Sequence, residues 1–210
     1  MCSSDLDARR HAELLAPMIG QVLAESGLLL GDIDLIACGV GPGPFTGLRV
    51  GIATALTLAE ASGLPCVGAC SLDAIAWAAV PGTALTVLTR ARRAEVNLAT
   101  YDEQLLRTGG PMVVRDEGLH VEGRCLGDAG PVDALAYPRA ADLGSFVLSR
   151  LAAGEPMPEP LALPEDAADA SGSSTAAVLQ ERAAAGRYLL PVAPIYLRRP
   201  DAAIPEGLAS

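Results

Sequence analysis

The segment at residues 39–51, GVGPGPFTGLRVG, alternates glycine with proline and then runs into a sequence typical of a helix. The apolar stretch before it, at 32–40, predicts a short buried strand. The residues after it, at 46–61, are rich in small side chains and predict a helix with Thr46 as its N-cap. A strand that enters a glycine-rich loop and leaves as a helix is typical of α/β proteins, so we expect a sheet with crossover helices.

This loop has features of an anion site. Gly41 and Gly43 allow positive φ and a close approach of the backbone to a ligand. The first helical turn, with Thr46 and Gly47, offers unpaired amides at the positive end of the helix dipole. The charge of Arg49 opposes that dipole, so we expect its side chain to point at an acidic group, a phosphate or a row of carbonyls. The loop lacks the Walker lysine and the dinucleotide fingerprint spacing, so a tight connection packed against another lobe is the alternative.

The rest of the first 80 residues continues the alternation of helices and strands. The expected order is helix, strand, helix, strand, helix, at residues 6–26, 32–40, 46–61, 65–69 and 71–79. Gly27 is the expected stop of the first helix, Pro17 its expected kink or boundary, and Ser71 the expected cap of the last. The pattern predicts an α/β fold.

The second half is patterned less regularly. We expect strands at 85–88 and 95–101 in a hairpin around a charged turn, helices at 140–153 and 176–185, and a strand at 192–197. The predicted organisation is a first lobe at 1–80, a second lobe at 81–186 with a flexible loop near 154–174, and a C-terminal strand and tail at 187–210.

Composition excludes several kinds of chemistry. All 15 basic residues are arginine, which excludes a P-loop or Schiff-base lysine. The net charge of −10 would repel the phosphates of nucleic acid. The two histidines lie far apart in sequence, so no metal site is expected, and Cys66 and Cys70 are expected to be buried thiols. An odd number of scattered cysteines and the lack of a long apolar run predict a cytoplasmic chain without a membrane span.

The string GPGPFTGLRVGIATALTLA, at residues 41–59, closely resembles the signature of the TsaB (YeaZ) family. Members are accessory subunits of the machinery that attaches threonylcarbamoyl to N6 of adenosine 37 in tRNA (t6A). The stretches at 11–19, 64–72 and 194–198 resemble the family's first long helix, the strand and helix after the loop, and the C-terminal P-x-Y-L-R. The resemblance covers most of residues 9–80 and 188–202 and is thin between 100 and 185.

The resemblance implies an actin-like, sugar-kinase-like two-lobe fold. It also implies a heterodimer with the related catalytic subunit TsaD, joined by the ATPase TsaE, with tRNA met only through the complex; a homodimer is also open. TsaD carries a metal-binding His-x-x-x-His, and the matching stretch at 67–75 has no histidine. The expected role is therefore a non-catalytic scaffold without a cofactor, ATP belonging to the complex. The alternatives are a glycoprotease-like peptidase or hydrolase, and an actin-fold nucleotide-binding ATPase.

Two features depart from the family. Members begin with a strand, a turn and two further strands, whereas this chain begins at about the first helix. We therefore expect a first lobe incomplete at its N-terminus, with an exposed sheet edge. The family's D-A-R-x-G-E-V-Y motif keeps Arg92 and Glu95, but its leading acid is Arg90 here, and its aromatic residue is Asn97. A solvated hairpin turn is the alternative interpretation of this stretch.

The helices at 6–26 and 46–61 are the expected docking surface for TsaD. Their small residues would let the helix backbones of two subunits approach closely. The candidate interface residues are Met18, Val22, Leu48, Ile52 and Leu56, all of which fit a place in the core equally well.

Overall fold

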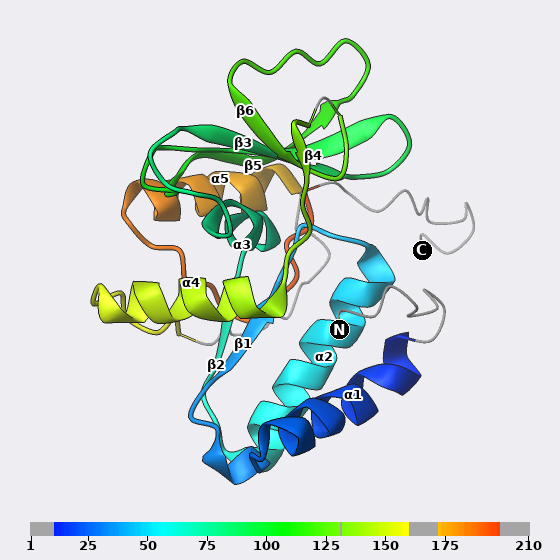
Figure 1. Cartoon of the computed structure of the whole chain (residues 1–210), viewed down its shortest axis with the longest axis vertical. Coiled ribbons are helices and arrows are strands. Elements are labelled where there is room, and N and C mark those ends of the chain that lie inside the picture. The colour runs from blue at the N-terminus through cyan, green and yellow to red at the C-terminus, as the bar shows by residue number, and fades with distance from the viewer. Residues whose placement is uncertain (1–10, 131, 160–171, 198–210) are drawn as a thin grey trace, which may run out of the picture.

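The computed structural model describes residues 11–130, 132–159 and 172–197 of the chain. Its strands form a two-stranded sheet and a five-stranded sheet (Figure 1). The predicted helical residues 6–10, much of the predicted loop at 154–174, and the tail beyond residue 197 lie outside the described residues. The predicted alternation of helices and strands is confirmed in the part that is described.

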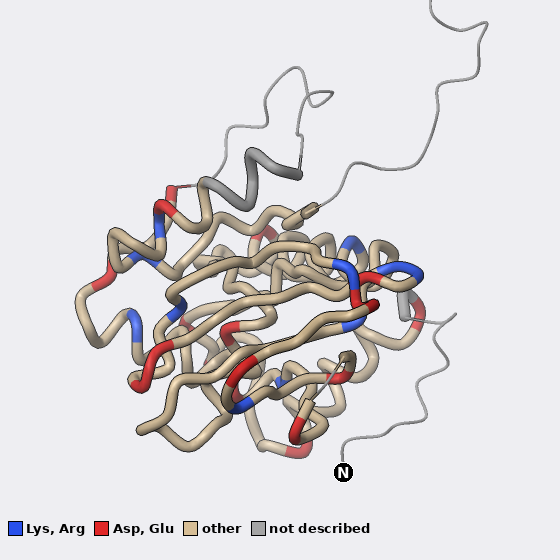
Figure 2. Tube along the Cα trace, turned by 90° about the horizontal axis from the view of Figure 1, so that it is seen from above, with Lys and Arg blue, Asp and Glu red and all other residues tan. Residues whose placement is uncertain are grey.

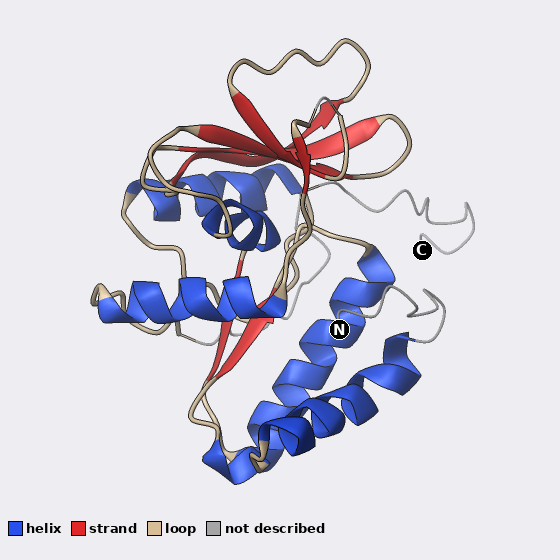
Figure 3. Cartoon of the chain, viewed as in Figure 1, coloured by secondary structure: helices blue, strands red, loops and turns tan. Residues whose placement is uncertain are grey.

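The small sheet pairs β1 (Ile36–Gly39) with β2 (Cys66–Ala69) in parallel. α2 (Phe45–Ser62) connects the two strands, and α1 (His11–Ser26) lies beside α2 (Figure 3). Among the described residues β1 pairs with no strand other than β2, and α4 (Ala140–Ala152) packs against β1. The exposed sheet edge expected from the sequence stays a prediction.

Two of the predicted caps are wrong. Pro44 takes the N-cap position of α2, and its carbonyl accepts the N–H of Leu48 at 2.9 Å, so Thr46 lies inside the first turn. α3 (Ser71–Trp77) likewise starts one residue after Cys70, and neither helix has a side-chain cap. Gly27, at φ +69°, does end α1 as predicted.

The large sheet has the strand order β5-β4-β3-β6-β7. β3 (Leu85–Arg90) and β4 (Glu95–Tyr101) form the predicted antiparallel hairpin, and β6 (Arg124–Gly127) runs parallel to β3. The sequence predicts none of three strands, which are β6, β5 (Arg107–Arg115) and β7 (Ala134–Leu135). Figure 2 shows that the charged residues gather in turns, while the strands of this sheet are mostly uncharged.

The predicted helices of the second half are confirmed as α4 (Ala140–Ala152) and α5 (Gly172–Ala184). α3 and α5 lie under the five-stranded sheet, and α4 packs against α3 and β1 (Figure 1). One core cluster draws on all three predicted units, with Val40 from the first, Val87 from the second and Leu190 from the third. The proposed boundaries at 80/81 and 186/187 stay predictions.

The predicted strand at 192–197 is wrong. The chain from Tyr188 to Leu197, which we call the strap, pairs with the sheet only at Leu190, opposite Gly68. Pro191 and Pro194 have no N–H group to donate to a ladder, which explains why no strand continues here. The strap instead crosses the carboxyl ends of β1 and β2 as an irregular segment.

We expect Gly68→Ala to destabilise the protein. A Cβ atom at this position would lie 2.7 Å from Val40 Cγ1 and 2.8 Å from the carbonyl oxygen of Pro191, so the strap or the strand must shift. The free energy of unfolding should fall by about 1–3 kcal/mol in urea titrations followed by circular dichroism. Gly51→Ala is the matched control, because nothing lies within 4 Å of its Cβ position. This helical substitution should leave stability equal or raise it by about 0.5–1 kcal/mol; an equal loss in both variants would contradict the close approach at Gly68.

Candidate functional site

The Gly-Pro loop is packed from inside by two other segments. The carbonyl of Gly41 accepts the N–H of Ser71 at 2.8 Å, and the carbonyl of Val40 accepts the N–H of Ile195 at 2.8 Å. Gly41 has φ +104°, and a Cβ there would lie 3.1 Å from Leu48 Cδ2. Glycine is thus required both by conformation and by space. These contacts support the alternative interpretation of the loop as a tight connection packed against other segments.

The outer side of the loop remains accessible. Gly43 and Thr46 are exposed, and Gly47 is half-buried at the start of α2. The N-cap residue Pro44 provides no side-chain acceptor for the first-turn amides of α2. Anion binding at these amides stays a prediction.

Arg49 contacts a hydroxyl group and an aromatic ring of its own chain, while the acidic group, phosphate or row of carbonyls expected from the sequence stays a prediction. Its Nε donates a hydrogen bond to the Tyr196 hydroxyl at 3.1 Å, and its Cζ lies 4.0 Å from the centre of the Phe45 ring. The rings of Phe45 and Tyr196 are 5.5 Å apart. These three side chains, which we call the Arg49 cluster, join the strap to the first turn of α2. The contacts give the guanidinium an oxygen acceptor and a π face within its own chain.

The structure divides the five candidate interface residues. Leu48 and Ile52 belong to the core, being 9% and 7% exposed. Val22 on α1 is 60% exposed, Leu56 on α2 is 45% exposed, and Met18 is half-buried. Leu48 and Ile52 therefore fit the core alternative that the sequence left open, because these residues lie on the side of α2 that faces the sheet.

Val22 and Leu56 are exposed apolar side chains on two helices that pack against each other. Among residues 13–26 of α1, no side chain is buried, and α1 packs on α2. A hollow of about 500 Å³ on α2 is lined by Leu56, Thr57, Glu60 and Ala61. We call the exposed side of these two helices, with Met18, Val22 and Leu56, the α1–α2 surface. Its apolar side chains would gain burial from a partner.

The motif residues of the second lobe lie at the β3–β4 turn. Arg92 is exposed, and Glu95 begins β4 half-buried. The turn is closed by the N–H of Ala91, which donates to the carbonyl of Glu95 at 3.0 Å. Its geometry is that of a hairpin turn at the surface, while the part that Arg92 and Glu95 play stays untested.

Sequence reasoning missed a buried charge cluster between the two sheets. Asp73 and Arg107 are 1% and 3% exposed, with Arg107 Nε 3.7 Å from Asp73 Oδ1. The Tyr101 hydroxyl donates to the same oxygen at 2.9 Å. Burial raises the pKa of the Asp73 carboxyl, and the nearby guanidinium opposes this rise. The one signal in the sequence was an acid within the apolar helix SLDAIAW. The cluster ties α3 to β4 and β5, and removing one partner of such a pair typically costs about 3–5 kcal/mol.

The described cysteines have the properties of core thiols. Cys38, Cys70 and Cys125 are buried, which confirms the expectation for Cys70, whereas Cys66 is half-buried. Burial raises the pKa of Cys38 to about 11, that of Cys70 to about 12 and that of Cys125 to about 11. Thiols with such pKa values are protonated at neutral pH and react poorly as nucleophiles.

Among the described residues, no group of three or more His, Cys, Asp and Glu side chains could hold a metal ion. Nor does this part of the chain contain a helix with the length and apolar character needed to cross a membrane.

Residues 5–178 match the family model of TsaD, tRNA N6-adenosine threonylcarbamoyltransferase. The chain belongs to the TsaD family. It is 37% identical over 198 residues to an uncharacterized protein of Mycobacterium tuberculosis, covering 94% of this chain and 79% of that protein. It is also 38% identical over 100 residues to the tRNA threonylcarbamoyladenosine biosynthesis protein TsaB of Escherichia coli, covering 46% of this chain and 43% of the relative.

Among solved structures, YeaZ from Pseudomonas aeruginosa superposes with a TM-score of 0.61 at 29% identity, covering 69% of this chain and 79% of that chain. Together with the TsaD family model, this confirms the resemblance to TsaB and YeaZ and the actin-like fold expected from it. Two of the stretches that carry the likeness meet in space, since Arg49 of the stretch at 41–59 donates a hydrogen bond to Tyr196 of the stretch at 194–198. Arg198, the last residue of the P-x-Y-L-R stretch, lies outside the described residues.

We expect Cys38, Cys70 and Cys125 to resist alkylation by iodoacetamide at pH 8 in the folded protein. Their folded pKa values exceed the unfolded value of 9.0, so the protonated thiols favour folding below pH 9. This contribution to stability is lost as the pH rises through about 11 to 12. Mass spectrometry of labelled peptides checks the prediction, with protein unfolded in urea as the control. Equal labelling of the folded and unfolded forms would contradict it.

Proposed function

We propose that this chain is a non-catalytic partner subunit in the threonylcarbamoylation of adenosine 37 in tRNA, and that it binds TsaD through the α1–α2 surface. Its similarity to proteins described as TsaB supports the pathway. The observation that carries the docking site is α1 itself, a helix on which residues 13–26 have no buried side chain although several are apolar. A helix of this kind is stabilised when a second apolar surface covers it.

Several properties support a scaffold role. The buried thiols are protonated at neutral pH, and the Asp73–Arg107 pair is enclosed in the core, where both side chains are shielded from a substrate. The net charge of −10 makes this chain a poor surface for tRNA, so tRNA would meet the complex elsewhere.

The proposed complex works in the cytoplasm and includes TsaE as a further component. We assign ATP to the complex and no cofactor to this chain. A homodimer would use the same α1–α2 surface and would compete with TsaD for it.

We expect Val22→Asp and Leu56→Asp each to weaken binding to the cognate TsaD by about tenfold or more, because a carboxylate would be buried without a partner in the interface. Both side chains are well exposed, so the fold should tolerate the changes. Leu148→Asp on α4 is the matched control, since Leu148 is exposed on another helix. Isothermal calorimetry gives the affinities, and a t6A formation assay with TsaD and TsaE gives the activity.

Three outcomes are informative. Loss of TsaD binding in the two variants, with Leu148→Asp unchanged, supports the proposal. If the wild-type chain fails to bind TsaD, the proposed function is wrong. If both variants lose only self-association, as seen by analytical ultracentrifugation, the surface serves a homodimer and the docking proposal is wrong.

A further inference from the structure

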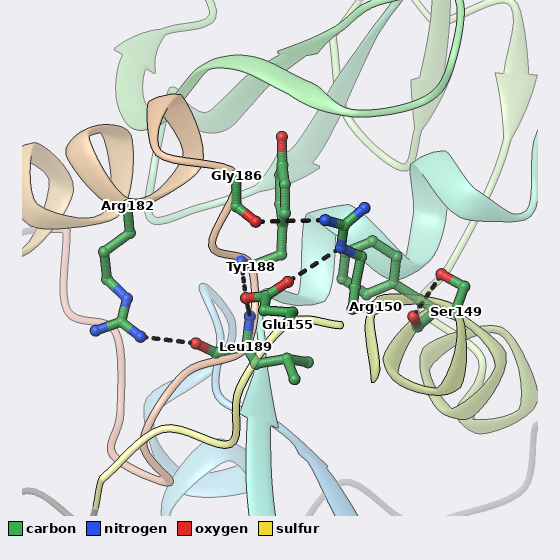
Figure 4. A network of polar contacts seen from close by, with 8 residues as sticks. Ser149, Arg150, Glu155, Arg182, Gly186, Tyr188 and Leu189 are labelled. Atoms are coloured by element: carbon green, nitrogen blue, oxygen red, sulfur yellow. Dashed lines mark hydrogen bonds and ion pairs between the residues drawn. The ribbon is translucent and has the colours of Figure 1, made fainter. Parts of the chain in front are cut away.

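The strap is anchored at its start by one buried carboxylate. Glu155 follows α4, and its Oε1 accepts the N–H groups of Tyr188 and of Leu189, the latter at 2.6 Å (Figure 4). Its Oε2 accepts Nε of Arg150 at 3.0 Å, and the Arg150 guanidinium lies 4.7 Å from the centre of the Tyr188 ring. Glu155 is buried, so these contacts satisfy a charge that would otherwise be costly to enclose. The start of the strap is therefore held in one place relative to α4.

The middle of the strap is tied to both strands of the small sheet. Leu190 and Gly68 exchange two backbone hydrogen bonds, at 2.7 and 2.9 Å. The N–H of Ile195 then donates to the carbonyl of Val40 at 2.8 Å. Since Leu189, Leu190 and Ile195 are buried, this part of the strap has little freedom to move along the sheet.

The far end of the strap meets the first turn of α2. The Tyr196 hydroxyl accepts a hydrogen bond from Nε of Arg49, and the Tyr196 ring packs on Phe45. With Pro44 at the N-cap, Phe45 lies in the first turn of α2, and Arg49 follows one turn later on the same side of the helix. α2 also has no side-chain cap. The Arg49 cluster thus holds the start of α2 through Tyr196 of the strap, where α2 has no side-chain cap of its own.

We propose that Tyr196 and Glu155 are positioning residues for partner binding, which set the orientation of the start of α2 through the strap. This inference rests on the proposed function, because α2 forms half of the α1–α2 surface. Tyr196 acts directly on Arg49 and Phe45, whereas Glu155 acts from the other end of the strap. Both keep the surface in the geometry that a partner would bind, which reduces the ordering cost of association.

The effect of the Tyr196–Arg49 contact on partner binding can be tested without a large change in the stability of the fold. Phe45 and Arg49 are exposed, so the hydrogen bond from Arg49 to the Tyr196 hydroxyl lies at the protein surface and contributes little to the stability of the fold. Tyr196→Phe removes only that hydroxyl and keeps the ring beside Phe45. A residue with a merely structural role in the core would change the melting temperature, whereas this variant should shift it by less than about 2 °C.

The experiment compares Tyr196→Phe, Glu155→Gln and Glu155→Ala with the wild-type chain. The matched controls are Tyr137→Phe and Glu159→Gln, whose side chains are exposed elsewhere. Calorimetry measures the affinity for TsaD, and hydrogen–deuterium exchange measures the protection of the backbone N–H groups within the segment 44–50, which are those of residues 45–50. We expect Tyr196→Phe and Glu155→Ala to weaken TsaD binding by about tenfold and to speed exchange at 44–50. Glu155→Gln should have a smaller effect, because its carbonyl can still accept both backbone N–H groups.

The outcomes separate this inference from the proposed function. If the wild-type chain does not bind TsaD, the proposed function and the partner role of both residues are wrong. If the wild type binds and Tyr196→Phe binds equally well with unchanged exchange at 44–50, the positioning role is wrong. Should Glu155→Ala fail to fold, Tyr196→Phe and Glu155→Gln decide the question. An equal loss in Tyr137→Phe would also overturn the inference, since that hydroxyl is far from the strap in sequence and is exposed.

Discussion

The close crossing of the strap over the small sheet is the constraint on which the rest of the structure depends. A parallel pair of only two strands, in the described part of the chain, is too small to be stable alone. The strap adds backbone hydrogen bonds at Gly68 and Val40, at the carboxyl ends of the two strands. It can come this close only because Gly68 has no side chain, and a Cβ there would lie within 3 Å of Val40 and Pro191.

The same crossing determines what the Gly-Pro loop can do. In open α/β sheets, the carboxyl ends of the strands are the usual place for a ligand. Here the N–H of Ile195 in the strap donates a hydrogen bond to the carbonyl of Val40, and the N–H of Ser71 in α3 donates to the carbonyl of Gly41. The inner side of the loop is therefore used for packing, and its outer side supports the start of α2.

The elements that could be predicted from sequence are those whose signals are local. The small side chains of α2 and the two strand-like segments around the charged β3–β4 turn are signals within a few residues, and both predictions are confirmed. The N-caps were wrong by one or two residues, because a threonine or serine signal cannot show that Pro44 or Cys70 already occupies the cap position. β5 was missed because Gly109, Gly110 and Pro111 interrupt its pattern, and only pairing with β4 makes it a strand.

The candidate site shows the same division. By itself, the sequence determined the α/β class, the unusual loop and the absence of lysine, since these depend only on residue types and their spacing. Only the tertiary structure decided that Leu48 and Ile52 belong to the core, while Val22 and Leu56 face outward. It also decided that Arg49 contacts Tyr196 and that Glu155 holds the strap, which are contacts across 147 and 34 residues of chain. Such contacts depend on how the layers pack against each other. Local sequence patterns therefore do not show which distant residues will be in contact.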